Sequence, residues 1–314
     1  MKNLNIIKIP VCLLFFYSCV THSNQNQHDE ETNSGSLPVI SFEKAIDKIT
    51  ITGLRDVGSS ITYIPLESVN QGKLGNLQKI IVTDSHIAIN DSENVFMYDS
   101  SGRFLRRIGE KGQGKGKYQN VLDFCFSLDE QKIYILAFSL AERRYLEYEI
   151  NGNFVTETVI DSVPTQILPL TNELFAFHCG NYPAVMVSSV DQSLIITDLK
   201  SKWRYHQNYH KRSNNAEIAV LRSPFYLHQG NIRFKEYGCD TLFTVTEEKL
   251  IPYSIFHLGK VEMPPDVSLK ELQSPKYSGH VWILNILKKM KITMLKWQWG
   301  QIVLFTDSII NPAM

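Results

Sequence analysis

A repeat of about fifty residues is the feature that most constrains the fold of this 314-residue chain. The segment NVFMYDSSGRFLRRIG, at residues 94–109, is echoed by RYLEYEINGNFVTETVI at residues 144–160. In each copy an alternating apolar run leads to a turn that ends in glycine, Gly102 or Gly152, and a phenylalanine follows two positions later. Looser copies of the pattern begin further along the chain, at Leu194 and at Thr241.

Short β-like segments fill the chain from about residue 61 onward. Each is rich in Ile, Val, Phe and Tyr, and breaks containing Asn, Asp, Ser or Gly separate them, which is typical of consecutive antiparallel strands. No long segment before residue 278 shows the 3.6-residue periodicity of a helix. A period of this length with about four strands is the sequence mark of propeller blades. We therefore predict an all-β fold, a β-propeller of four-stranded antiparallel blades, of which about four are recognisable.

Residues 45–277 resemble a known family through motifs that keep their order. The segments ITYIPLES, NVFMYDSSGRFLRRIG and GQGKGKY are similar to the opening Tyr-Ile-Pro-Leu-Glu strand, the F-D-x-x-G-x-F hairpin and the Gly-x-Gly-Pro-Gly-Glu-Tyr loop of the six-bladed β-propeller lipoproteins of Bacteroidota. CDTLFTVTEEKLIPYSIFHLGK resembles a later blade of these uncharacterised, NHL-like propellers. The resemblance implies a six-bladed ring and an exported lipoprotein. It brings little function, because most such proteins have no defined biochemical activity.

Residues 1–18 predict a secretory signal peptide. Lys2 and Lys8 give a positive start, a short apolar run follows at residues 11–17, and the sequence then turns abruptly polar. An apolar run of this length is too short to span the roughly 30 Å hydrocarbon layer of a membrane as a helix. We therefore expect export and removal of this segment.

Cys19 predicts a lipid anchor. It follows Ser18, where a bacterial lipobox places its lipidated cysteine, although Phe16 stands where such motifs usually have leucine. An ordinary secretory signal with an incidental cysteine is the alternative. Residues 19–44 are expected to be a lipidated, disordered tether, because their acidic and polar part is poor in apolar residues. The predicted partner is then a lipid bilayer, and the predicted location is the outer membrane, facing the periplasm or the cell surface.

The segment at residues 278–314 departs from the repeat. It holds four lysines and a single acidic residue, Asp307, and several apolar side chains fall at helix-like spacing. Three interpretations remain open: a divergent blade, an amphipathic helix at a membrane or partner surface, or a truncated or frame-disturbed end. Four recognisable blades against an expected six favour the last, because an unclosed ring leaves strand edges exposed.

The glycine-rich segment IGEKGQGKGKYQN, at residues 108–120, approaches a phosphate-binding loop. That motif needs a hydroxyl residue after its lysine and a helix beyond it. Here Gly116 replaces the hydroxyl residue, and the alternating apolar residues that follow predict a strand. We interpret the segment as a connection between blades. Lys115 and Lys117, which stand where the resembling family has Pro and Glu, are candidate contacts to an anionic glycan or lipid; a solvated face is the alternative.

The segment WRYHQNYHKR, at residues 203–212, is the densest aromatic and basic cluster. Trp203, Tyr205, His206 and Tyr209 could stack on sugar rings and hydrogen-bond to hydroxyl groups; an ordinary blade surface is the alternative. Lys plus Arg and Asp plus Glu both number 32, so the zero net charge argues against a nucleic-acid partner. No metal site or cofactor is predicted.

No catalytic motif is recognisable. The chain lacks G-x-S-x-G and H-E-x-x-H, and Cys125, Cys179 and Cys239 are too irregularly spaced for zinc or a disulfide framework, so buried free thiols are expected. The predicted function is a non-catalytic scaffold that binds a glycan, peptide or partner protein. The alternative is a metal-dependent propeller enzyme of lyase or lactonase type, with ligands converging on the central channel.

Overall fold

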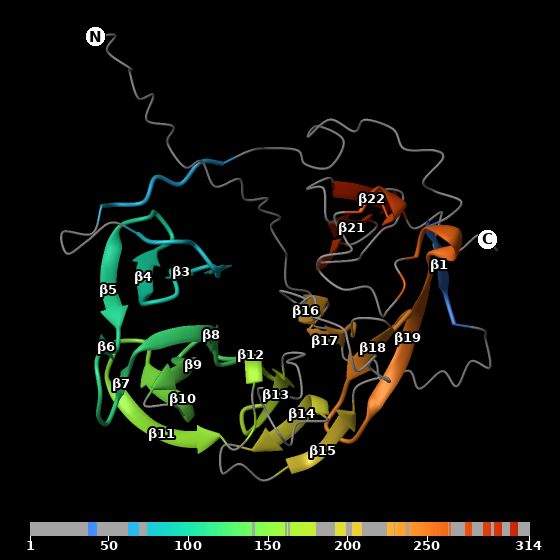
Figure 1. The fold of residues 1–314 in the computed structure, drawn as a ribbon. Coiled ribbons are helices and arrows are strands. Elements are labelled where there is room, and N and C mark those ends of the chain that lie inside the picture. Colours follow the sequence, from blue (N-terminus) through green and yellow to red (C-terminus); the bar gives the residue numbers. More distant parts are fainter. Residues whose placement is uncertain are drawn as a thin grey trace, which may run out of the picture.

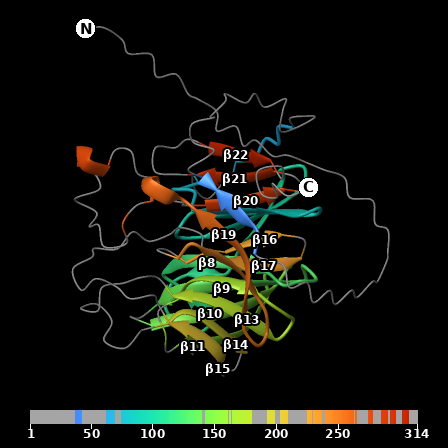
Figure 2. The ribbon, with the colours of Figure 1, turned by 90° about the vertical axis from the view of Figure 1, so that its right-hand side faces the viewer.

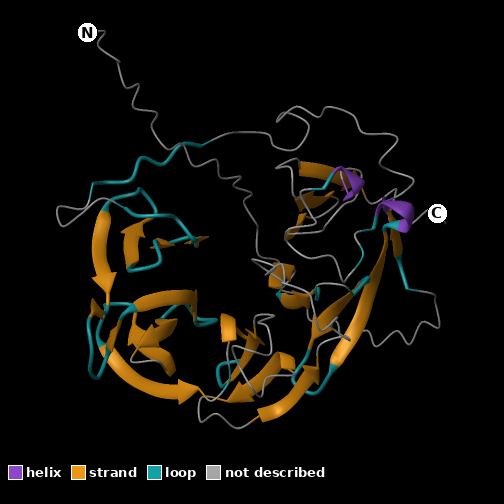
Figure 3. Cartoon of the chain, viewed as in Figure 1, coloured by secondary structure: helices purple, strands orange, loops and turns teal. Residues whose placement is uncertain are grey.

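The computed structural model is built almost entirely of β-strands (Figure 3). It describes residues 37–42, 62–68, 74–139, 142–160, 162, 164–179, 192–198, 203–208, 225–228, 230–236, 239–262, 264, 274–277, 285–289, 292–296 and 302–306. Two short 3-10 turns, η1 (Gly259–Val261) and η3 (Pro275–Tyr277), lie wholly within these residues. No helix of the described chain is long and apolar enough to cross a bilayer.

Four sheets repeat one design, with four strands joined in chain order. The first contains β2 (Lys79–Val82), β3 (His86–Asn90), β4 (Val95–Asp99) and β5 (Phe104–Ile108). The second contains β8 (Asn120–Phe126), β9 (Lys132–Ser139), β10 (Glu142–Glu149) and β11 (Phe154–Ile160). The third contains β12 (Pro164–Pro169), β13 (Leu174–Cys179), β14 (Gln192–Asp198) and β15 (Trp203–Asn208). The fourth contains β16 (Phe225–His228), β17 (Asn231–Phe234), β18 (Thr241–Val245) and β19 (Leu250–His257). All these neighbours pair antiparallel.

The sheets follow one another around a common centre, as the blades of a propeller do (Figure 1). Figure 2 shows the same sheets from the side. The last strand of each four-stranded sheet lies at the outer rim, and the strand order places the first strand at the opposite, inner edge. The predicted β-propeller of four-stranded antiparallel blades is therefore confirmed. Described strands form five blades, and the sixth that the resemblance implies stays an expectation.

The fifth blade lies in the segment that departed from the repeat. β20 (Asn285–Lys289), β21 (Ile292–Lys296) and β22 (Ile302–Thr306) form a three-stranded antiparallel sheet. The amphipathic-helix interpretation is wrong for these residues, and the divergent-blade interpretation fits them. The apolar positions that suggested a helix belong to two neighbouring strands, β20 and β21. These strands pair from Asn285 opposite Lys296 to Lys289 opposite Ile292.

The propeller also begins earlier than the expected boundary at residue 45. β1 (Val39–Ser41) pairs parallel with β19 and adds a fifth strand to the fourth blade. Residues 62–68, expected to form a sheet strand, instead lie along the outer hairpin of the first blade. There the backbone N–H of Glu67 donates to the carbonyl of Gly102 at 2.8 Å, and its carboxylate accepts from the N–H of Phe104 at 2.9 Å.

The hydrophobic core is divided into layers between successive blades. One cluster joins Val95 and Met97 of the first blade to Phe124 and Ile135 of the second. Equivalent clusters lie between the second and third blades and between the third and fourth. Strands such as β13, all of whose residues are buried, have neighbours on both faces. This is why the blade strands contain nearly continuous apolar runs, as in sheets covered on both sides.

The fifty-residue repeat is reproduced in three dimensions by the outer hairpins of the first two blades. Gly102 and Gly152 both adopt left-handed backbone conformations, with φ of 89° and 93°. In the first blade the rings of Tyr98 and Phe104 meet edge to face at 5.5 Å, and in the second the rings of Tyr148 and Phe154 do so at 5.7 Å. The glycine turns the chain so that the following phenylalanine packs on the preceding tyrosine.

Candidate functional site

The glycine-rich segment connects the first blade to the second. Its ends, β6 (Glu110–Lys111) and β7 (Lys117–Tyr118), form a short parallel pair. Gly109, with φ of 69°, passes so close to the second blade that a Cβ atom would lie 2.6 Å from the Tyr148 hydroxyl and 2.7 Å from the Tyr118 ring. This close approach between blades leaves no room for a Cβ atom, which is why glycine stands at this position.

Two buried tyrosines fix this loop. The hydroxyl of Tyr118 donates to the carbonyl of Ile108 at 2.5 Å, and that of Tyr148 donates to the carbonyl of Gly116 at 3.0 Å. Burial raises the pKa of both phenols above the ordinary value of 10.0. They therefore remain protonated donors at any physiological pH, and the loop backbone is held on both sides.

The loop's charges are largely matched by carboxylates. Lys117 pairs with Glu110 at 2.9 Å, and this contact lowers the pKa of the Glu110 carboxyl below its usual value. Lys111 pairs with Glu93 at 2.8 Å. Lys115 is exposed, with its ammonium 5.9 Å from the centre of the Phe154 ring. Of the two candidate lysines, Lys115 is thus the one that presents its charge outward.

One backbone N–H that a phosphate would need already has a partner in the protein. The backbone N–H of Gly116 donates to the carboxylate of Glu157 at 3.0 Å, and strand β8 follows the loop where a nucleotide-binding loop would have a helix. Arg144 also contacts Glu157, at 3.4 Å. The interpretation of the segment as a connection between blades therefore agrees with the structure.

A carboxylate that sequence reasoning missed joins three blades. Asp123, on inner strand β8, is 4% exposed. One of its oxygens accepts from the ammonium of Lys79 on β2 at 2.8 Å, and the other accepts from the backbone N–H of Ile167 on β12 at 2.9 Å. Lys79 also donates to the carbonyl of Phe124 at 2.8 Å. We call this set the Asp123 bridge. Its only sequence signal was an acidic residue inside the apolar run VLDFCF.

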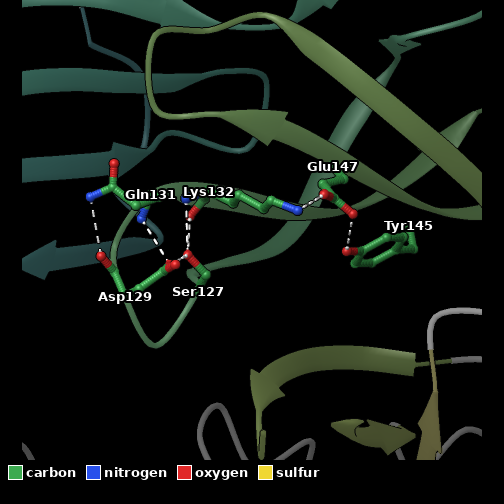
Figure 4. A network of polar contacts seen from close by, with 6 residues as sticks. All are labelled: Ser127, Asp129, Gln131, Lys132, Tyr145 and Glu147. Atoms are coloured by element: carbon green, nitrogen blue, oxygen red, sulfur yellow. Dashed lines mark hydrogen bonds and ion pairs between the residues drawn. The ribbon is translucent and has the colours of Figure 1, made fainter. Parts of the chain in front are cut away.

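A second buried carboxylate, Glu147, lies within the second blade (Figure 4). It accepts from the ammonium of Lys132 at 2.6 Å and from the hydroxyl of Tyr145 at 3.3 Å. The hydrogen bond to Glu147 raises the pKa of Lys132. At the adjoining turn, Ser127 donates to Asp129 at 2.5 Å, which lowers the pKa of the Asp129 carboxyl. These contacts fix the hairpin between β8 and β9 and neutralise the buried charge.

Two buried basic side chains also have partners inside the fold. Burial lowers the pKa of His178 to about 3, so its ring stays neutral beside the Thr165 hydroxyl, 3.3 Å away. Burial also lowers the pKa of Lys235, whose ammonium donates to the backbone carbonyl of Cys239. Neither group lies in a set of metal-ligating side chains, and the described part of the chain contains no cluster of three or more His, Cys, Asp or Glu that could hold a metal ion.

The aromatic cluster lies on a different blade from the glycine-rich loop. Trp203, Tyr205 and His206 belong to β15, the outermost strand of the third blade, where they pair with Thr197, Ile196 and Ile195 of β14. The structure does not bring these residues together with Lys115 or Lys117. Tyr209 and Cys19 lie outside the described residues.

Three cysteines of the blades were expected from their irregular spacing to be buried thiols outside any disulfide. Cys125, Cys179 and Cys239 are buried, and none of the three forms a disulfide. Burial raises the pKa of the Cys125 thiol, which therefore stays protonated and unreactive as a nucleophile.

Comparison with known proteins identifies the family and the fold. Residues 37–306 match the family model described as "Domain of unknown function (DUF4934)". A solved structure from Bacteroides fragilis, described as a "Putative exported protein", aligns with a TM-score of 0.61 at 15% identity, covering 80% of this chain and 76% of that one. A Bacteroides caccae protein of unknown function aligns with a TM-score of 0.45 at 9% identity, covering 73% and 77%. The β-propeller domain of Myceliophteria thermophila Cps50 gives a TM-score of 0.40 at 10% identity, covering 74% and 66%. No curated protein matches the sequence.

Proposed function

We propose that this chain, which belongs to the DUF4934 family, is an exported, lipid-anchored β-propeller that acts as a non-catalytic scaffold for binding a glycan, peptide or partner protein. The observation that carries the proposal is how the buried charges are used. Asp123, Glu147 and Lys235 each contact partners within or between blades. Charged side chains that contact partners inside the protein stabilise a rigid frame. A catalytic side chain would instead need to face a substrate.

Export and anchoring are supported by the N-terminal sequence and by one structural relative. Lys2, Lys8 and the apolar run at residues 11–17 have the order of a signal peptide. The Bacteroides fragilis protein of similar fold is described as a "Putative exported protein". Cys19 would carry the acyl chains, and more than one chain is needed for stable attachment.

The anchor predicts a clear result for Cys19→Ser in a bacterial host that processes lipoproteins. The wild-type chain should incorporate labelled fatty acid and sediment with the membrane fraction. The variant lacks the acceptor thiol, so it should incorporate none and appear in the soluble fraction. The wild-type chain and the Cys19→Ser variant should show the same thermal unfolding midpoint. Fatty-acid labelling of the Cys19→Ser chain, or a wild-type chain without label, would contradict the anchor.

Trp203 and Tyr205, on the rim of the third blade, are the residues through which we propose that a glycan binds. Indole and phenol rings stack on the apolar faces of sugars and add hydrogen bonds at their edges. Trp203→Ala should weaken retention on the glycans that the wild-type chain binds by about tenfold, equivalent to about 1.4 kcal/mol. Glycan-array binding of the unacylated chain, lacking residues 1–19, would measure this.

Leu128→Ala provides the control for that experiment. Leu128 is an exposed apolar residue, 57% accessible, in the β8–β9 turn of the second blade. Its removal should leave glycan retention unchanged. A folded wild-type chain that retains no glycan, and captures no peptide or envelope protein either, would overturn the binding proposal.

A further inference from the structure

One turn contains a chemically labile pair that the proposed function does not use. Asn151 and Gly152 form the chain's single Asn-Gly sequence, in the exposed turn between β10 and β11. The backbone nitrogen after an asparagine can attack its side-chain carboxamide. Glycine at that position hinders the attack least, because it has no Cβ atom and the freest backbone.

The reaction needs only water. The Gly152 nitrogen, after losing its proton, forms a bond to Cγ of Asn151; the bond from Cγ to Nδ2 breaks, and ammonia leaves. The product is a five-membered succinimide. Water then adds to one of the two carbonyl carbons, the bond from that carbon to the ring nitrogen breaks, and the nitrogen regains its proton. Attack at Cγ gives aspartate, and attack at the backbone carbonyl carbon gives isoaspartate. No oxidation state changes.

The folded turn engages both reacting groups. The Gly152 N–H donates to the carbonyl of Glu149 at 2.8 Å. The Asn151 carboxamide accepts from the N–H of Asn153 at 2.8 Å and donates to the Glu149 carboxylate at 2.9 Å. We propose that Asn151 is a site of spontaneous deamidation that the folded turn suppresses, with Glu149 as the positioning residue, so that modification occurs only where this hairpin opens.

The modification would have a consequence beyond the turn. It would place a new carboxylate where the carboxamide of Asn151 now contacts the carboxylate of Glu149, and like charges at such a distance repel. The same turn supplies the carbonyl of Ile150, which accepts from the Arg106 guanidinium of the first blade at 3.0 Å. Deamidation would therefore loosen both the hairpin and its contact with the neighbouring blade.

The first blade contains a matched turn without the labile pair. There Gly102 donates to the carbonyl of Asp99 at 3.0 Å, and Asp99 donates to the carbonyl of Arg103 at 3.0 Å. Ser101 occupies the place that Asn151 has in the second blade, two residues after the acidic residue and directly before the glycine. Asn151→Ser therefore copies a turn that the fold already accommodates.

The test follows deamidation by peptide mass spectrometry, as a gain of about one dalton on the peptide that contains residue 151. The unacylated chain is incubated at neutral pH in buffer and in concentrated urea. In buffer the wild-type rate should be at least about tenfold lower than in urea, because modification requires a local opening that costs upward of about 1.4 kcal/mol. Asn151→Ser should show no gain in either condition.

Two variants test the role of Glu149. Glu149→Ala removes the acceptor and should deamidate several-fold faster than wild type in buffer but equally fast in urea. Glu149→Gln retains an acceptor oxygen and should stay close to the wild-type rate in buffer. Equal wild-type rates in buffer and urea, no mass gain in urea, or a Glu149→Ala rate in buffer equal to that of wild type would each overturn the proposal.

Discussion

Asp123→Ala should lower the free energy of unfolding by about 2–4 kcal/mol, the largest loss that we expect from removing a single polar side chain. The change removes the acceptor of a buried backbone N–H, that of Ile167, which then has no partner in the bridge. It also removes the carboxylate that faces Lys79. Lys79 is 31% exposed, so water compensates part of its loss, and the expected cost stays below that of a fully buried ion pair. Urea-induced unfolding would measure the change.

Two variants separate the parts of this effect. Asp123→Asn keeps an acceptor for Ile167 and loses only the charge opposite Lys79, so it should cost less, about 1 kcal/mol. Glu142→Ala serves as the control, because the Glu142 side chain is 47% exposed and pairs with Arg144 at 3.2 Å. Losing this surface ion pair should change the free energy of unfolding by less than about 1 kcal/mol. If Asp123→Ala costs no more than Glu142→Ala, the Asp123 bridge does not hold the blades together.

Gly109→Ala should destabilise the chain by about 2–5 kcal/mol. An alanine Cβ would lie 2.6 Å from the Tyr148 hydroxyl and 2.7 Å from the Tyr118 ring. Both rings are fully buried, so overpacking should cost about 1–3 kcal/mol. The left-handed backbone, with φ of 69°, adds about 1–2 kcal/mol for any residue with a Cβ. Thermal and urea unfolding should both report the loss.

Gly230→Ala isolates the steric part of that cost. Gly230 has nearly the same backbone angle, φ of 73°, but a Cβ there would meet nothing within 4 Å. This control should therefore lose only the backbone term of about 1–2 kcal/mol. Equal losses in the two variants would mean that the close approach of Gly109 to the second blade costs nothing.

The sequence predicts the blade hairpins well because their determinants are local. Gly102 and Gly152 sit in turns that need a left-handed backbone, and each following phenylalanine packs on a tyrosine only a few residues away. The glycine-rich loop is recognisable for the same reason. Its glycines meet a short-range geometric demand that few other residues satisfy.

Contacts between distant segments were not predictable from a single sequence. Nothing in VLDFCF indicates that Asp123 meets Lys79 on one blade and Ile167 on another. The parallel pairing of β1 with β19 could not be predicted either, because the three residues of β1, VIS at residues 39–41, are too few to form a recognisable strand pattern. The sequence left three interpretations of residues 278–314 open, because the apolar residues suit a helix as well as two short strands, and only pairing with neighbours decides between these two.

The pairing of Val39 with Ile255 joins two distant parts of the chain. Each four-stranded blade is made of contiguous residues, so its hairpins close over short loops and can form soon after the segment emerges. β1 emerges before all of them, yet its partner, β19, is the last strand of the fourth blade. The first three blades therefore lie between the two paired strands in the sequence. The entropy cost of closing a loop grows with the length of chain between its ends, so this contact costs more loop entropy than any hairpin within a blade.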